Sequence, residues 1–313
     1  MIEARNLIQR YGAKTAVDDV SFVIRPGRVT GFLGPNGAGK STTMRMIIGL
    51  DRPTSGTVTV NGKPYGRHAA PLREVGALLE AKAAHPGRSA YSHLRALAAT
   101  HGFPKSRVDQ VIEIVGLKDV ARKRSGAFSL GMGQRLGIAV ALLGDPATLV
   151  LDEPVNGLDP DGVLWVRKLL NRLASEGRTV FVSSHLMSEM ALVATHLIVI
   201  GRGKILADSG IEAFIDQAAQ NHVRVRSPEA VRLAEVLKAG GASVSATPDG
   251  ALRVVGLAIE AVGEAAAAQG IALHELADRR ASLEEAFMKL TGDTIEYHGT
   301  SEREASPPAK KGG

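Results

Sequence analysis

The stretch that decides the fold is Gly34-Pro35-Asn36-Gly37-Ala38-Gly39-Lys40-Ser41, which fits the phosphate-binding pattern G-x-x-x-x-G-K-[ST]. Before it, residues 28–33 are expected to form a short buried strand, because they follow a turn at Pro26-Gly27. After it, residues 42–48 carry the apolar spacing of a helix. A glycine-rich loop between a strand and a helix predicts a phosphate-binding site, and this context disfavours an ordinary turn that binds nothing.

The residue types in this loop suit a polyphosphate. Glycines let backbone N–H groups point inward, where a Cβ would collide. The start of the next helix, at Thr42, adds unpaired donors and the positive end of the helix dipole. Lys40 is expected to hold the β- and γ-phosphates, and the Ser41 hydroxyl is expected to bind Mg²⁺. We therefore expect the phosphates and the metal to bind along Gly34 to Thr42.

Composition limits the classes of protein to consider. The 313 residues allow two domains, or a large domain and a small one. The net charge is +6, but no Lys/Arg run exceeds the three residues 122–124, and aromatic residues make up only 4%. A scattered solvated surface is therefore favoured over a nucleic-acid surface, and no nucleic-acid partner is expected. The absence of cysteine excludes disulfides, thiolate metal sites and cysteine nucleophiles.

No stretch of the sequence predicts a membrane span. The longest apolar run, 138–143, falls far short of the roughly 20 residues that a spanning helix needs. The first residues lack the apolar core of a signal peptide. We expect that the chain does not cross a membrane itself.

A second group of candidate site residues follows two apolar segments. Residues 148–151 are followed directly by the carboxylates Asp152 and Glu153, and residues 179–182 are followed three positions later by His185. The carboxyl ends of parallel strands share one edge of a sheet, where ligands bind. A metal-bound phosphate needs one carboxylate near the metal and one base near the attacking water. An N-cap for the helix after Pro160 would not explain both acids, whereas a structural, hydrogen-bonded role remains the alternative for His185.

The remaining elements of the first two thirds are expected from their periodicity. Tyr11 is placed at a turn, either covering the sheet or stacking on a base, and these two readings stay open. The expected strands are 2–8, 17–24, 56–62, 72–80, 197–200 and 204–207. The expected helices are 92–100, 107–115, 133–143 and 161–175.

The pattern changes after about residue 215. The spacing predicts a small α+β unit over 216–292, in which no catalytic constellation is found, so a structural or partner-docking role is expected. Its strands are expected at 223–226, 242–246, 251–255 and 271–276, and its helices at 229–239, 258–269 and 282–290. Residues 293–313 have the composition of a disordered tail.

Together these motifs make residues 1 to about 210 resemble the ATP-binding cassette (ABC) ATPases. The signature motif, which sets this family apart from other P-loop proteins, is similar to Phe128–Arg135. The other matches are Leu149–Glu153 with the Walker B strand and its catalytic glutamate, Asn156–Asp159 with the D-loop, His185 with the switch histidine, and Tyr11 with the adenine-stacking aromatic.

The resemblance implies a fold and a function. The expected fold is α/β, a P-loop NTPase domain over 1–215 with antiparallel β and helical subdomains, the helical one at about 82–146, followed by the small α+β domain. The implied function is the ATP-binding and ATP-hydrolysing subunit of an exporter-type ABC transporter. It would couple hydrolysis to transport through a separate membrane permease, at the cytoplasmic face of the membrane. ATP and Mg²⁺ are the implied ligands.

The resemblance also implies roles for single residues. Glu153 would polarise water, Lys40 would stabilise transition-state charge, and His185 would contact the γ-phosphate. Ser41 and Asp152 would hold the metal. Ser129, Gly131 and Asp159 would contact nucleotide, with the signature serine and glycine reaching the ATP of a second subunit in a head-to-tail dimer.

The chain departs from the usual family pattern in two motifs. The signature usually reads Leu-Ser-Gly-Gly-Gln, whereas this chain has Phe128-Ser129-Leu130-Gly131-Met132, and Glu80 stands where a Gln normally contacts Mg²⁺. Both departures, and the sequence 282–287, resemble the antibiotic and multidrug exporter branch of daunorubicin and bacitracin type. Residues 81–95 would then receive the permease, although packing within the helical subdomain is an equal alternative. A smaller departure is Thr195, where the family often has Asp.

Two other functions are alternatives to a transporter subunit. A soluble ABC protein acting on nucleic acid or ribosomes would have paired cassettes or long coiled coils, whereas this chain has one P-loop, one signature and no sustained heptads. The altered signature keeps open a regulator that binds nucleotide without hydrolysing it, whereas Glu153 and His185 argue against such a regulator.

Overall fold

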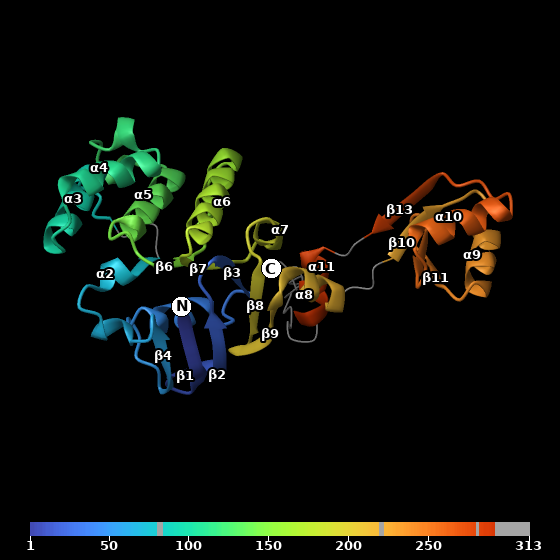
Figure 1. The fold of residues 1–313 in the computed structure, drawn as a ribbon, viewed down its shortest axis with the longest axis horizontal. Helices are drawn as coiled ribbons and strands as arrows, with labels where there is room; N and C mark the ends of the chain where they lie inside the picture. Colours follow the sequence, from blue (N-terminus) through green and yellow to red (C-terminus); the bar gives the residue numbers. More distant parts are fainter. Residues whose placement is uncertain (80–83, 219–221, 280–281, 292–313) are drawn as a thin grey trace, which may run out of the picture.

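The computed structural model describes residues 1–79, 84–218, 222–279 and 282–291, and its larger domain is built around one six-stranded sheet (Figure 1). The strand order is β5-β6-β7-β3-β8-β9, with the first five strands parallel and β9 antiparallel at one edge. The strands are β3 (Arg28–Leu33), β5 (Val75–Leu78), β6 (Thr148–Asp152), β7 (Thr179–Ser184), β8 (His196–Gly201) and β9 (Lys204–Gly210). This arrangement confirms the expected α/β class.

A second sheet covers one face of the central sheet, and helices cover the other (Figure 1). The second sheet is antiparallel, in the order β2-β1-β4, with β1 (Ile2–Tyr11), β2 (Lys14–Ile24) and β4 (Ser55–Val60). Phe22, Phe32 and Phe181 pack between the sheets with ring centroids 5.1 to 6.1 Å apart. Burying each such ring contributes about 1.5–3 kcal/mol, so the phenylalanine cluster anchors the two sheets to each other.

The helices of this domain are short, and several begin at capping residues. They are α1 (Lys40–Ile47), α2 (Pro71–Glu74), α3 (Ala90–Thr100), α4 (Lys105–Ile114), α5 (Leu130–Leu142), α6 (Pro160–Ser175), α7 (Met187–Ala191) and α8 (Ile211–Ala218). Ser89 caps α3 by accepting a hydrogen bond from the Ser92 N–H (3.1 Å), and Ser129 caps α5 by accepting one from the Met132 N–H (3.2 Å). Helix α5 therefore begins before residue 133, where the apolar spacing had placed its start.

One expected strand is wrong at its beginning. Residues 72–80 were expected to be extended, but Pro71–Glu74 is a helical turn and only Val75–Leu78 is a strand. Pro71 occupies the first helical turn, where its fixed φ favours the helix. Glu80 lies outside the described residues.

Residues 222–279 form a small domain with a core of its own. Its sheet has the antiparallel order β11-β12-β10-β13, and its chain order is β-α-β-β-α-β, as in ferredoxin-like domains. Its elements are β10 (His222–Arg226), α9 (Ala230–Ala239), β11 (Ser243–Ala246), β12 (Leu252–Val255), α10 (Ile259–Ala268) and β13 (Glu275–Arg279). The last strand begins at Glu275 rather than at the expected residue 271, and Ile271 is instead a buried core residue outside a strand.

The last described helix, α11 (Leu283–Thr291), does not join the small domain to which the sequence assigned it. It packs against α8 and α7, and it buries Leu283, Ala286 and Phe287 in the same core as Met190. These three residues lie at i, i+3 and i+4, so they form one apolar face that needs an apolar partner. The buried strand residues of the small sheet already pack with α9 and α10. Residues 222–279 are therefore an insertion between α8 and α11.

Candidate nucleotide-binding site

The P-loop connects the end of β3 to the start of α1, as expected. Gly39 has φ +109°, and a Cβ at this position would lie 2.6 Å from the Ala16 carbonyl oxygen, so the loop requires glycine here. The Lys40 side chain is buried, and its ammonium donates to the carbonyl oxygens of Gly34 (2.6 Å) and Pro35 (3.2 Å). Burial lowers the pKa of Lys40, and the nearby charges of Glu153 and Asp152 partly oppose this effect.

Hydroxyl groups hold the Asp152 carboxylate toward the P-loop. Ser41 Oγ donates to Asp152 Oδ2 at 2.6 Å, and Ser183 Oγ donates to Asp152 Oδ1. Ser183 faces Asp152 in the register of β6 and β7, so the parallel sheet itself creates this contact. Ser183 was not predicted from the sequence, although a hydroxyl at the end of a neighbouring strand was the signal that could have identified it.

The oxygen atoms at this point suit a magnesium ion. Mg²⁺ prefers oxygen ligands, and it is usually bound by one or two protein groups together with waters and substrate phosphates. Ser41 and Asp152 supply a hydroxyl and a carboxylate oxygen beside the loop. Within the described ranges, no group of three or more His, Cys, Asp or Glu side chains is placed to hold a metal. These residues therefore offer part of a coordination shell, which a bound phosphate would extend.

Glu153 and His185 form a direct pair at the same edge of the sheet. His185 Nδ1 lies 2.8 Å from Glu153 Oε2, and the His185 N–H donates to the same oxygen at 3.4 Å. Glu153 has φ +50°, a left-handed conformation that is uncommon for a residue with a side chain. Its N–H donates to Ser183 Oγ at 3.0 Å. The expected proximity of these two residues is confirmed, because β6 and β7 are adjacent parallel strands.

Tyr11 ends β1 at the rim of this site. Its hydroxyl donates to Asp51 Oδ2 at 2.8 Å, and Arg45 Nε binds the same oxygen at 2.8 Å. Arg45 lowers the pKa of Asp51, so this carboxylate stays charged and holds the phenol in place. Partial burial and the Asp51 carboxylate raise the pKa of Tyr11. Half of the Tyr11 surface is still exposed, which leaves the ring accessible to a ligand.

These groups surround one cavity of about 320 Å³. It is lined by Tyr11, Lys14, Ala16, Asn36, Gly37, Gly39, Lys40, Ser41, Thr42, Asp152 and Glu153. Most of the residues that the sequence predicted to bind phosphate, adenine or metal, and the predicted general base Glu153, therefore line one cavity. Lys14 and Ala16 were missed, because they belong to a strand with no motif of its own.

Three expected nucleotide contacts lie elsewhere. Ser129 and Gly131 lie at the start of α5, where Ser129 lines a different cavity of about 500 Å³. Asp159 caps α6, with its Oδ1 accepting a hydrogen bond from the Gly162 N–H at 3.0 Å. Leu130 packs against Gly157, where no side chain could be added. A single chain therefore does not bring its signature residues to its own P-loop cavity.

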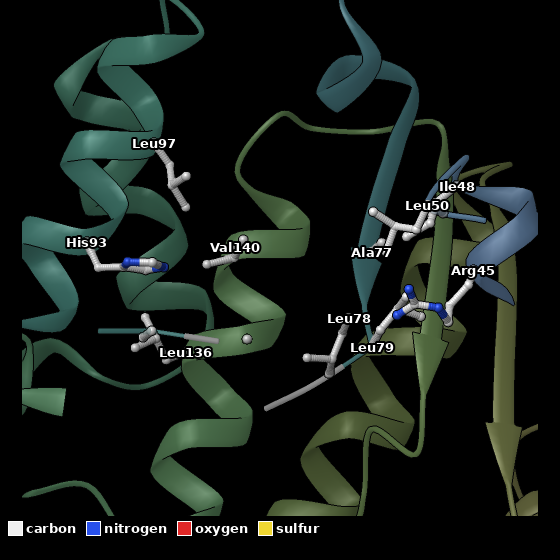
Figure 2. A pocket seen from close by; sticks show the side chains of 12 residues that line it. Arg45, Ile48, Leu50, Ala77, Leu78, Leu79, His93, Leu97, Leu136 and Val140 are labelled. Carbon is white, nitrogen blue, oxygen red and sulfur yellow. The ribbon is translucent and has the colours of Figure 1, made fainter. Parts of the chain in front are cut away.

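A third cavity, of about 510 Å³, lies between the helical subdomain and the rest of the domain (Figure 2). Side chains of α3 and α5 form one wall, and those of α1 and β5 form the other (Figure 2). It is lined by Arg45, Ile48, Leu50, Ala77, Leu78, Leu79, Ala84, His93, Leu97, Leu136, Gly137 and Val140. Burial, and then the charge of Arg88, lower the pKa of His93, which favours the neutral ring and an apolar cavity.

The region expected to receive the permease is only partly in this cavity. Residues 81–83 lie outside the described residues, whereas Ala84 and His93 line the cavity. The Tyr91 ring instead lies beneath the Arg122 guanidinium, 5.5 Å from it. Tyr91 therefore packs within the helical subdomain, whereas His93 and Leu97, on the same helix, reach the cavity.

Comparisons with known proteins agree with this geometry. The family described as ABC transporter matches residues 17–156, and a domain of unknown function (DUF8746) matches residues 221–284. An uncharacterised ABC transporter ATP-binding protein of Bacillus subtilis, YhcH, is 37% identical over 95% of this chain and 97% of its own length. The bacitracin transport ATP-binding protein BcrA of Bacillus licheniformis is 42% identical over 66% of this chain and 69% of its own length. A solved dimeric structure of a bacterial ABC transporter cassette is 23% identical, with a TM-score of 0.63, over 67% of this chain and 98% of that chain.

The fold and the site define a P-loop ATPase of the cassette type. The chain belongs to the family of ABC transporter ATP-binding proteins. The resemblance seen in the motifs is thereby confirmed, as are nucleotide binding and ATPase activity as its biochemical class. No helix among the residues described here has the length and apolar character to span a membrane.

Proposed function

We propose that this chain hydrolyses ATP to drive export of an antibiotic-like compound through a separate membrane permease. The observation that carries the enzymatic part is the meeting of Lys40, Ser41, Asp152 and Glu153 around one cavity, with His185 bound to Glu153. The relationship to a bacitracin transport protein supports the export of a peptide antibiotic or a lipid-like drug.

In this proposal each side chain has a role that follows from its position. The P-loop backbone and Lys40 bind the β- and γ-phosphates, and Tyr11 stacks on the adenine. Glu153 accepts a proton from the attacking water. His185 orients the Glu153 carboxylate and contacts the γ-phosphate. Charged groups fixed in advance around the transferring phosphoryl group are the main source of catalysis in reactions of this type.

Ser41 and Asp152 are the residues that would hold Mg²⁺, which would neutralise phosphate charge when bound. The Ser41–Asp152 hydrogen bond places both oxygens on the loop side of the site before any metal binds. Whether Glu80 adds a third ligand stays a prediction from the sequence, because Glu80 lies outside the described residues.

The active form in this proposal is a head-to-tail dimer of two copies. Ser129 and Gly131 sit at the N-terminus of α5, away from the P-loop cavity of their own chain. A helix that begins at a serine cap can bind a phosphate of the ATP held by the second copy. Asp159, which caps the neighbouring helix α6, would reach the same interface.

The partner in the membrane would dock at the cavity between the helical subdomain and the rest of the domain. Its apolar lining suits a short amphipathic helix of a permease, which would bury the partly exposed side chains of Leu97 and Val140. In this proposal the docked chain would lie at the cytoplasmic face of the membrane. One wall of this cavity belongs to the helical subdomain that carries the signature, so docking would be coupled to dimer closure.

A nucleic-acid or ribosomal function is not favoured. The chain has one P-loop and one signature, and the curated relatives at 37% and 42% identity are transporter proteins by name. A non-hydrolysing regulator is disfavoured by the Glu153–His185 pair, which such a protein would not need.

Copurification tests the transporter assignment directly. A tagged chain, isolated from gently solubilised membranes, should bring down a polytopic membrane protein, and Leu97→Glu should release it while ATP binding is kept. Val231→Glu, at an exposed position on α9, is the matched control and should leave the complex intact. Cells that express the complex should tolerate more of a peptide antibiotic such as bacitracin than cells that express a Glu153→Gln form. Equal tolerance would overturn the drug-export assignment, and a chain that isolates alone would overturn the permease.

A further inference from the structure

Gln134 is a polar side chain on the buried side of α5. It is 4% exposed, and its helix neighbours Leu136 and Ile138 are core residues. A buried amide is costly unless its donors and acceptor find partners. The Gln134 Nε2 donates to the carbonyl oxygen of Glu153 at 2.9 Å. The signature helix therefore touches the main chain of the catalytic glutamate.

The Glu153 backbone is held from both sides of the residue. Its N–H donates to Ser183 on β7, and its carbonyl accepts hydrogen bonds from Gln134 and from the Asn156 N–H at 3.1 Å. These contacts enclose the left-handed φ of +50°. A residue in this region persists only where its surroundings determine it, and the backbone angles of Glu153 decide where its carboxylate points.

We propose that Gln134 is a positioning residue for Glu153, fixing the peptide on its C-terminal side so that the carboxylate is aimed at the attacking water. This inference rests on the proposed role of Glu153 as the base. Gln134 touches neither nucleotide nor water in this assignment, and it acts only through the Glu153 main chain.

Gln134 lies on the same helix as Ser129, so its contact with Glu153 connects the signature to the catalytic glutamate. Gln134 lies five residues after Ser129 on one continuous helix, which is about 7.5 Å along the axis. Ser129 faces the ATP of the second copy in the proposed dimer, whereas Glu153 serves the ATP of its own chain. Leu130 and Gly157 pack against each other beside this path. Closure onto one ATP would therefore adjust the base at the other.

The test is a double-mutant cycle between Gln134 and Glu153. Gln134→Met keeps the length of the side chain and removes its donor, and it should lower kcat roughly 10–100-fold, as expected for a misdirected catalytic group, with little change in KM for ATP. Gln134→Asn, which keeps an amide but is too short to reach, should act in the same direction and serves if the Met variant does not fold. In the Glu153→Gln background, Gln134→Met should lower the residual rate by less than about twofold, because coupled residues are non-additive.

Arg135→Met is the matched control on the same helix. Arg135 Nη1 also donates to a main-chain carbonyl, but to that of Val115 at 2.9 Å rather than to that of Glu153. The fall in kcat caused by Arg135→Met should add fully to the fall caused by Glu153→Gln. If Glu153→Gln keeps wild-type turnover, the proposed base is wrong. If Glu153→Gln is inactive but Gln134 variants keep wild-type kcat, or their effect adds fully to that of Glu153→Gln, only the positioning role is overturned.

Discussion

The imidazole Nδ1 of His185 lies 2.8 Å from the Oε2 oxygen of Glu153, although 32 residues separate them in the chain. The contact arises because β6 and β7 are parallel neighbours that end at one edge of the sheet. A histidine that binds a carboxylate in this way can fix its direction and share a proton with it.

Replacing the acid of this pair should separate binding from chemistry. Glu153→Gln keeps the size of the side chain and removes the base, so ATP affinity should stay nearly unchanged while turnover falls about 10²-fold or more. Phosphate release under saturating ATP, with affinity from a separate binding titration, measures both quantities. Asp161→Asn removes an exposed acid from the first turn of α6 and should leave turnover intact. Normal turnover in Glu153→Gln would remove Glu153 from the role of base.

A matched pair of serine caps tests the dimer. Ser129→Arg should block ATP-dependent dimerisation, because a bulky cation would replace the hydroxyl that, in the proposed dimer, faces the second nucleotide. Ser89→Arg changes the same type of N-cap on α3, and both variants lose about 1 kcal/mol of helix capping. Size-exclusion chromatography with ATP, in a Glu153→Gln background, should show a dimer for the Ser89 variant and a monomer for the Ser129 variant. Two dimers would show that the signature does not face a second nucleotide.

Lys40 should weaken the fold of the nucleotide-free protein. Burial lowers its pKa, so below that pKa the folded state bears the cost of a desolvated charge, and the cost disappears as pH rises toward the unfolded pKa of about 10.4. Lys40→Met should therefore raise the Tm without nucleotide by about 2–4 °C at neutral pH, with a smaller gain near pH 10. It should also abolish the stabilisation that ATP gives to the wild-type protein.

Thermal unfolding with and without ATP measures both effects of the Lys40 substitution. Lys14→Met removes an equal charge from an exposed position and should leave the Tm of the nucleotide-free protein nearly unchanged. A lower Tm for Lys40→Met would mean that the hydrogen bonds to Gly34 and Pro35 outweigh the burial of the charge.

The ring and the hydroxyl of Tyr11 can be tested separately. Tyr11→Ala should weaken ATP binding about 5- to 150-fold, because stacking of a base on an aromatic ring contributes roughly 1–3 kcal/mol. Tyr11→Phe keeps the ring and loses only the hydrogen bond to Asp51, so its effect should be small. Isothermal titration with ATP and with inorganic triphosphate distinguishes the two causes, since triphosphate should bind all three proteins equally. A Phe variant as weak as the Ala variant would assign the effect to the hydroxyl.

The sequence predicted the parts of the site that follow from consecutive residues. The P-loop between Gly34 and Ser41 and the acids at the end of β6 needed only a motif and the rule that parallel strands end at one edge. The three-dimensional partners were harder to find. Ser183 contacts Asp152 because of strand register, and Gln134 contacts Glu153 because of how helix α5 packs. The sequence around Asp152 and Glu153 therefore does not indicate either contact.

The fold shows the same limit. The period of the apolar residues predicted most helices and strands, and the errors lie at their ends, where a single capping residue decides. Because Ser129 is the N-cap, α5 begins earlier than predicted, and because Pro71 favours a first helical turn, the beginning of one predicted strand is helical. The apolar face of α11 was visible, but periodicity does not say which partner covers it. The partner is α7 and α8 of the larger domain, from which α11 is separated by the whole small domain.

The insertion of residues 222–279 between α8 and α11 matters for how the small domain is removed in the laboratory. A stop codon after α8 would delete α11 as well, and the Met190 core would lose Leu283, Ala286 and Phe287. A shortened protein of that kind would fail through a damaged core whether or not the small domain matters for transport. An informative deletion excises the small domain internally and rejoins the chain with a short Gly/Ser linker. Such a protein keeps α11, which packs against α7, the helix that begins two residues after His185. It therefore isolates the contribution of the small domain.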